Sequence, residues 1–122
     1  MKIKCIVPIN IALDNGLYFF EPLGGTGKTY LCKLLGMLIG KGSNYAVVTY
    51  DNGVRVSGNL ENATLIVFDR FNLYFEEYNM NSLLNLAKHA IVLVDMKYEE
   101  LEGYSGSTAY IEYDGDCIEV HE

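Results

Sequence analysis

Basic side chains are scarce in this sequence of 122 residues. Nine Lys and Arg stand against sixteen Asp and Glu, which gives a formal net charge of −7 at pH 7. Nucleic acids and anionic membranes are bound through basic surfaces, so we expect neither of them as a direct partner. The acidic balance still leaves room for a local basic pocket that binds a small anion.

Cysteine and histidine are also rare, and their spacing matches no structural metal site. The three cysteines, Cys5, Cys32 and Cys117, are far apart, and the two histidines, His89 and His121, have no partner at ligand spacing. An odd number of isolated cysteines does not make a disulfide framework either. We therefore expect free thiols in a reducing cytoplasm.

Long apolar runs are absent, so we expect no segment that spans a membrane. The first residues are basic and then apolar, as at the start of a secretory leader. Pro8 and Asn10 interrupt that run, however, and no small-residue cleavage site follows it. The sequence thus predicts a cytoplasmic protein.

Strand and helix patterns alternate along the chain, which predicts an α/β fold in a single domain over residues 1–122. A helix is expected over 28–39, because its leucines have the spacing of one helical face: Leu31, Leu34, Leu35 and Leu38. A second helix is expected over 81–88. Apolar and aromatic runs predict strands at 17–20, 45–50, 64–68 and 91–94. We expect a mainly parallel sheet flanked by helices.

Two turns predict antiparallel hairpins at the ends of the chain. Asn15-Gly16 separates an expected strand at 2–12 from the strand at 17–20, and Asn-Gly between apolar runs is a strong hairpin signal. A similar turn, Asp114-Gly115, separates expected strands at 108–113 and 116–120. Both hairpins would add antiparallel strands to the parallel core.

Residues 22–29 hold the motif that indicates a chemistry. They read Pro22-Leu23-Gly24-Gly25-Thr26-Gly27-Lys28-Thr29, and the end matches the phosphate-binding pattern G-x-x-x-x-G-K-S/T. Glycines let backbone N–H groups approach a triphosphate closely, and the following helix directs its positive dipole end at the same phosphates. We expect the ammonium of Lys28 to bind the β- and γ-phosphates and the hydroxyl of Thr29 to bind Mg²⁺. The cradle of backbone N–H groups that surrounds the phosphates would come from Gly24, Gly25, Thr26 and Gly27.

The motif departs from this pattern at its first position, where Pro22 replaces glycine. Proline is compatible with a turn there, and Gly24 and Gly25 supply backbone freedom beside it. The alternative interpretation is a glycine-rich turn between a strand and a helix, with an accidental lysine. The position of the motif between an expected strand and an expected helix favours phosphate binding.

Two acidic residues end expected buried strands. Asp69 follows the run Leu65-Ile66-Val67-Phe68, as in strands whose terminal aspartate supports Mg²⁺, often through water. Asp95 follows the strand at 91–94. It is either a polar residue of the same site or a plain acid at the end of a strand.

With this loop and this strand, residues 17–95 resemble the P-loop NTPases. They resemble the group in which another strand lies between the loop strand and the Walker B strand, and residues 91–94 are the candidate for that inserted strand. The resemblance implies a nucleotide, most often ATP, with Mg²⁺. It also implies that Lys28 and Asp69 are catalytic, that Thr29 and Asp69 hold the metal, and that Asp95 takes the place of a polar sensor residue.

The sequence departs from catalytic members of that group directly after Asp69. They usually place a glutamate there to orient the attacking water, whereas this chain has Arg70, and its nearest glutamates are Glu76 and Glu77. We therefore expect nucleotide binding with slow or partner-dependent hydrolysis. The alternative is an interaction module that kept the fold and lost the nucleotide. A protein partner or a homo-oligomer is compatible with either.

Arginine is almost absent, since Arg55 and Arg70 are the two in the chain. Nucleotide kinases generally clamp two sets of phosphates with several arginines, so kinase activity is disfavoured. For Arg70 we expect a surface ion pair with Glu76 or Glu77. The alternative is that its guanidinium stabilises charge in the site, or in that of a neighbouring subunit.

Overall fold

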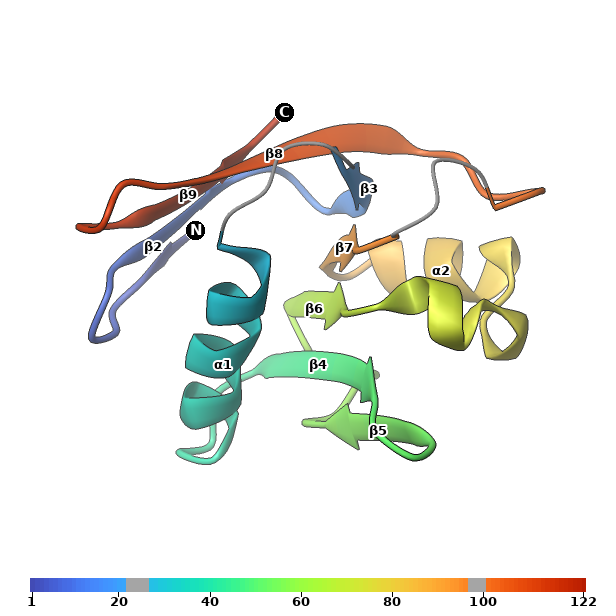
Figure 1. Ribbon diagram of the computed structural model, residues 1–122, viewed down its shortest axis with the longest axis horizontal. Coiled ribbons are helices and arrows are strands. Elements are labelled where there is room, and N and C mark those ends of the chain that lie inside the picture. The colour runs from blue at the N-terminus through green and yellow to red at the C-terminus, as the bar shows by residue number, and fades with distance from the viewer. Residues whose placement is uncertain (22–26, 97–100) are drawn as a thin grey trace.

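The strands of this chain form a single curled sheet (Figure 1). The computed structural model describes residues 1–21, 27–96 and 101–122. Within these segments, nine strands are hydrogen-bonded in the order β1-β2-β9-β8-β3-β7-β6-β4-β5. The strands are β1 (Lys2–Ile3), β2 (Ile9–Ala12), β3 (Gly16–Phe20), β4 (Tyr45–Tyr50), β5 (Val54–Ser57), β6 (Leu65–Phe68), β7 (Ile91–Val94), β8 (Ser107–Tyr113) and β9 (Ile118–His121). The helices are α1 (Lys28–Ile39) and α2 (Met80–Ala87), with two short 3-10 turns, η1 (Phe71–Leu73) and η2 (Phe75–Glu77).

Five neighbouring strands, β8, β3, β7, β6 and β4, run parallel and form the centre of the sheet. Strand β7 lies between β3 and β6, and Val92 is paired with Leu17 on one side and with Ile66 on the other. The position predicted for the strand at 91–94 is therefore confirmed. Parallel strands covered on both faces need apolar side chains throughout, and every residue of β6 and β7 is buried.

Each face of the central strands has its own core, because successive residues point to opposite faces. One core contains Leu65 and Leu93 and packs against α1. The other contains Phe68 and Val92 and packs against α2. Figure 1 shows the two helices on opposite sides of β6 and β7. The fold is thus α/β with a mostly parallel sheet, as expected.

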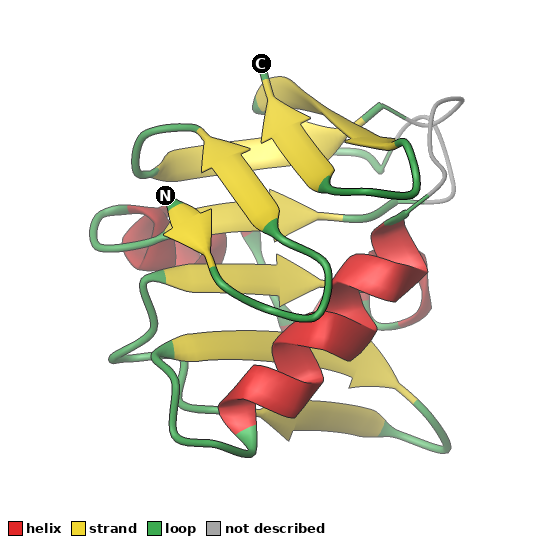
Figure 2. Cartoon of the chain, turned by 90° about the vertical axis from the view of Figure 1, so that its left-hand side faces the viewer, coloured by secondary structure: helices red, strands yellow, loops and turns green. Residues whose placement is uncertain are grey.

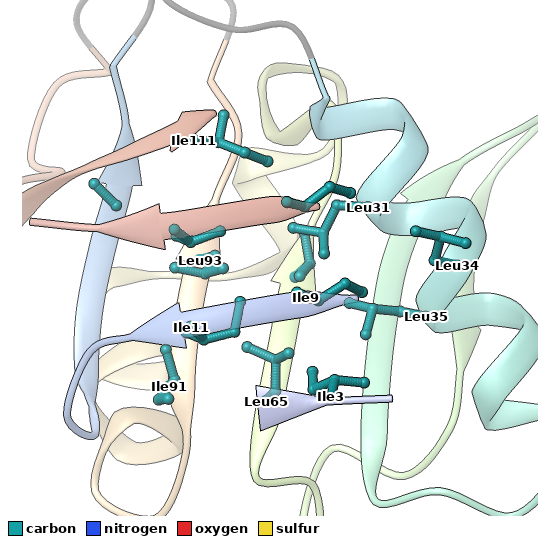
Figure 3. Packing of buried hydrophobic residues seen from close by; sticks show 14 of the residues in the cluster. Ile3, Ile9, Ile11, Leu31, Leu34, Leu35, Leu65, Ile91, Leu93 and Ile111 are labelled. Carbon is teal, nitrogen blue, oxygen red and sulfur yellow. The ribbon is translucent and has the colours of Figure 1, made fainter. Parts of the chain in front are cut away.

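The sheet curls so that β1, β2 and β9 come alongside α1 (Figure 2). Ile9 and Ile11 of β2 and Ile118 of β9 belong to the same buried core as Leu31 and Leu35 of α1. Figure 3 shows the isoleucines of β2 and the leucines of α1 directed into this shared space. Strands from both ends of the chain therefore help to hold the helix that follows the predicted phosphate-binding loop.

The predicted N-terminal hairpin is wrong in its pairing. Residues 2–12 form two short antiparallel strands, β1 and β2, with Pro8 directly before β2. Strand β2 pairs in parallel with β9, whereas β3, after Asn15-Gly16, pairs in parallel with β7 and β8. The physical reason is burial: Leu17 faces one core and Tyr18 the other, so β3 belongs in the centre of the sheet.

The C-terminal hairpin is confirmed. Strands β8 and β9 pair antiparallel, and Tyr113 lies opposite Ile118. The carboxylate of Asp114 accepts hydrogen bonds from the backbone N–H groups of Asp116 and Cys117, at 2.8 and 3.1 Å, which closes the turn. Strand β8 also pairs in parallel with β3, a pairing that the sequence pattern did not predict.

Both helices were predicted from the sequence, and α1 has the expected bounds. In α2, Leu83 and Ala87 are buried as expected, but Leu84 is 45 % exposed. The helix has eight residues, and its contacts with the sheet lie along the stripe that Leu83 and Ala87 share. None of the helices in the described segments is long and apolar enough to cross a membrane.

Candidate functional site

The predicted phosphate-binding loop ends at Gly27, directly before α1. Its φ of 110° lies in the left-handed region, and a Cβ added there would lie 3.2 Å from the Cβ of Tyr113. The backbone conformation thus strongly favours glycine at this position, and a Cβ would in addition make a tight contact with Tyr113. The other members of the predicted cradle, Gly24, Gly25 and Thr26, lie outside the described residues, as does Pro22.

Lys28 is the first residue of α1, and its ammonium is held at the carboxyl ends of β3 and β7. Its Nζ lies 3.4 Å from Oδ1 of Asp95 and donates to the carbonyl oxygen of Glu21 at 3.4 Å. It also lies 5.5 Å from the centre of the Phe20 ring, where a cation is attracted to the aromatic face. The side chains of Lys28 and Asp95 are 16 % and 13 % exposed, so this ion pair is largely shielded from water.

Asp69 follows β6 and is held by its neighbours on β4. Its Oδ2 accepts a 2.9 Å hydrogen bond from Oγ1 of Thr49, and its backbone N–H donates to the carbonyl oxygen of Val48 at 2.7 Å. The hydroxyl of Tyr74 donates to the carbonyl oxygen of Asp69 at 2.6 Å. These bonds orient the carboxylate at the carboxyl ends of the parallel strands.

A cleft of about 520 Å³ runs beside α1 at this end of the sheet. The residues that line it come from α1, from β4 and β5 with the turn between them, and from the segment after β6: Thr29, Cys32, Lys33, Gly36, Val47, Thr49, Tyr50, Asp51, Ser57, Asp69 and Arg70. The structure therefore brings Thr29 and Asp69, the predicted metal ligands, to the walls of one cleft.

The oxygen atoms of Thr29 and Asp69 are donors that suit Mg²⁺. This ion is usually bound through one or two carboxylates, and water and substrate phosphates complete its shell. A hydroxyl and a carboxylate on the same cleft, beside a helix N-terminus that favours anions, fit that mode of binding.

Arg70 also lines the cleft, and its predicted partner was wrong. Its Nε lies 3.7 Å from Oδ2 of Asp69. In the described part of the chain, no ion pair joins Arg70 to Glu76 or Glu77. Those two glutamates belong to η2 and line a separate hollow with Tyr50 and Leu73. The turn of the chain after Asp69 directs Arg70 and the glutamates to different places.

The carboxylates of this region act on the thiol of Cys32, one turn into α1. Burial raises the pKa of Cys32 well above its usual range, and the negative charges of Asp69 and Asp95 raise it further. Burial and the charge of Asp69 likewise raise the pKa of Tyr74 far above its ordinary value. Both groups are neutral at physiological pH, so the charges that the described residues bring to the site are its carboxylates and the cations Lys28, Lys33 and Arg70.

Sequence reasoning missed Thr49 and left the role of Asp95 open. Thr49 is a polar residue near the carboxyl end of an apolar strand, and Asp69 follows the neighbouring parallel strand. Because the carboxyl ends of parallel strands meet at one edge, polar residues at those ends were the available signal. What the sequence did not show was which of these residues pair with one another.

Comparisons of this chain with models of known protein families, with curated proteins and with solved structures found no match.

Proposed function

We propose that this chain is a P-loop nucleotide-binding protein that binds ATP with Mg²⁺ and hydrolyses it slowly or with the help of a partner. The observation that carries the proposal is the arrangement at the carboxyl edge of the sheet. With β7 between β3 and β6, Lys28 and Thr29 of α1 lie at the same edge as Asp69 and Asp95. Ligands of open α/β sheets bind outside the carboxyl ends of the strands.

Each residue has a stated task in this proposal. The backbone N–H groups of Gly27 and of the first residues of α1 would donate hydrogen bonds to phosphate oxygens. The left-handed conformation of Gly27 and the helix dipole favour an anion at this place. Lys28 would neutralise the β- and γ-phosphates, and Thr29 and Asp69 would hold Mg²⁺, which screens phosphate charge when bound. Gly24, Gly25 and Thr26 would complete the cradle.

Slow hydrolysis is proposed because the position that usually orients water is occupied by a cation. The Nε of Arg70 lies 3.7 Å from Oδ2 of Asp69, and Glu76 and Glu77 line a different hollow from the cleft. Asp95 is engaged by Lys28. Phosphoryl transfer depends on positioning and charge stabilisation, so a site without a placed base binds better than it catalyses. We expect turnover far below the roughly 1–100 per second of typical kinases.

A second candidate is an interaction module that kept this fold and does not bind nucleotide. The ion pair between Lys28 and Asp95 favours it, because the ammonium already has a carboxylate and the Glu21 carbonyl as partners. In such a module the pair would hold α1 to the sheet, and the partner would be a protein.

Nucleotide titration of the wild type and of Lys28→Ala separates these two functions. We expect a fluorescent ATP analogue with Mg²⁺ to bind the wild type and not Lys28→Ala. Lys41→Ala is the matched control, because it removes the same charge just beyond the other end of α1. A nucleotide that binds the folded state also raises the melting temperature. Equal affinity in Lys28→Ala would contradict phosphate binding through Lys28, and no rise in Tm with millimolar nucleotide would support the interaction module.

A further inference from the structure

We propose that the guanidinium of Arg70 binds the terminal phosphate, so that the site selects a nucleoside triphosphate over a diphosphate. This inference rests on the proposed nucleotide-binding function. It assigns a specificity-determining role to the residue that departs most clearly from the resemblance.

The backbone conformation of Arg70 does not favour arginine, which indicates that the side chain is the reason for an arginine at this position. Its φ of 54° and ψ of 44° lie in the left-handed region, where glycine and asparagine are favoured over arginine. In the described residues, Asn52 is the other non-glycine residue with positive φ, and asparagine is a usual occupant of that region. Residues held in this conformation against preference cluster at ligand sites.

The side chain of Arg70 contributes little to the fold. It is 53 % exposed and its Nε lies 3.7 Å from Oδ2 of Asp69, whose own side chain is 14 % exposed. Because the guanidinium is in contact with solvent and the separation is long, the pair has a small stabilising effect. Asp69 keeps its orientation without Arg70, because Thr49 donates to the same oxygen at 2.9 Å. The guanidinium is therefore able to turn from Asp69 to an incoming anion at low cost.

The position of Arg70 suits the third phosphate. It shares the cleft with Thr29 and Asp69, where the Mg²⁺ that bridges the β- and γ-phosphates would be held. The described cations that line the cleft are Arg70 and Lys33, whereas Lys28 is engaged at Asp95. A planar guanidinium binds two phosphate oxygens at once, which an ammonium does not, so Arg70 is suited to distinguish the presence of a γ-phosphate.

Substitution by glycine tests this role without damage to the backbone. Arg70→Gly removes the guanidinium and relieves the left-handed conformation, so its Tm should equal or exceed that of the wild type. Arg70→Lys keeps the charge and loses the planar fork. Two variants serve as controls: Asn52→Gly repeats the backbone change at the other left-handed residue, and Arg55→Ala removes the other arginine, which is on β5.

The measurement is the Kd of ATP and of ADP, each with Mg²⁺, for all five proteins. Arg70→Gly should lose about tenfold or more in ATP affinity and none in ADP affinity. Arg70→Lys should be intermediate, and both controls should match the wild type. An equal loss for ATP and ADP, or no loss, would overturn the role of Arg70 and leave the proposed function standing. A wild type that binds neither nucleotide would overturn both.

Discussion

The ammonium nitrogen of Lys28 lies 3.4 Å from a carboxylate oxygen of Asp95, and both side chains are mostly shielded from water. This pair joins the first residue of α1 to the residue that follows β7. The same ammonium is the group that would meet the phosphates of a nucleotide. In the proposed function, Asp95 and the nucleotide would therefore compete for one cation, and the charge of Asp95 would lower nucleotide affinity.

Removal of that charge should strengthen nucleotide binding. Asp95→Asn keeps the shape of the side chain, frees Lys28 and removes a negative charge that repels phosphate. We expect ATP affinity to rise about fivefold, the equivalent of roughly 1 kcal/mol of binding free energy. Asp116→Asn is the matched control, since it makes the same charge change on the exposed C-terminal turn. Isothermal titration calorimetry checks the prediction, and an unchanged or weaker affinity would contradict it.

The hydrogen bond from Thr49 to Asp69 should matter for Mg²⁺ more than for the fold. Thr49→Val keeps the β-branched shape on β4 and removes the 2.9 Å donor. We expect a loss of about 1 kcal/mol in the free energy of unfolding. Groups that orient a metal ligand typically change metal affinity about 10–100-fold, so Mg²⁺-dependent ATP binding should weaken by at least the lower figure.

Thr64→Val is the control for that prediction, because its hydroxyl donates to the carbonyl oxygen of Asn44, away from the cleft. ATP titrations at several Mg²⁺ concentrations separate the two variants. If Thr49→Val weakened binding equally with and without Mg²⁺, the proposed orienting role of Thr49 would be wrong.

Two glycines next to or within α1 should respond to alanine with opposite signs. Gly27→Ala forces a side chain into a φ of 110° and against Tyr113, and we expect it to cost about 1–3 kcal/mol. Gly36→Ala lies inside the helix, where an added Cβ meets nothing within 4 Å, and should stabilise the protein by about 0.5–1 kcal/mol. Urea denaturation of the two variants measures both values. Stabilisation by Gly27→Ala would show that the start of α1 is not constrained as described.

Stability should fall at alkaline pH because of Cys32 and Tyr74. Burial and nearby carboxylates raise the pKa of Cys32 above its ordinary value of 9.0 in the folded state. Above that pH the unfolded chain loses the thiol proton while the folded chain keeps it, so the unfolded state binds fewer protons and stability decreases as pH rises. The raised pKa of Tyr74 adds the same effect above its ordinary value of 10.0.

The limiting slope is about 1.4 kcal/mol per pH unit for each such group. Urea denaturation from pH 7 to pH 11 should show this fall in the wild type. In Cys32→Ala the fall between pH 9 and pH 10 should be smaller. Identical slopes in the two proteins would mean that Cys32 does not titrate differently on folding.

The pattern of side chains along the sequence was sufficient to place most elements of the chain. The leucine spacing of 28–39 marks a helix because helical residues three and four apart share a face. The continuous apolar runs at 65–68 and 91–94 mark strands that are covered on both sides. Together with the glycine-lysine-threonine motif, these local signals were enough to predict a mostly parallel sheet with Lys28 and Thr29 at the start of a helix.

Only the tertiary structure decided most of the strand neighbours, apart from the place of β7 between β3 and β6 and the pairing of β8 with β9. The apolar pattern of a strand predicts which of its residues are buried, but it does not identify the strand with which it pairs. For this reason Asn15-Gly16 predicted a hairpin, whereas β3 lies in the centre of the sheet. The pairs Lys28 with Asp95 and Thr49 with Asp69 join residues 67 and 20 positions apart. Such pairs form because the parallel order of β3, β7, β6 and β4 brings the carboxyl ends of these strands to one edge, and that order is a property of the packed sheet.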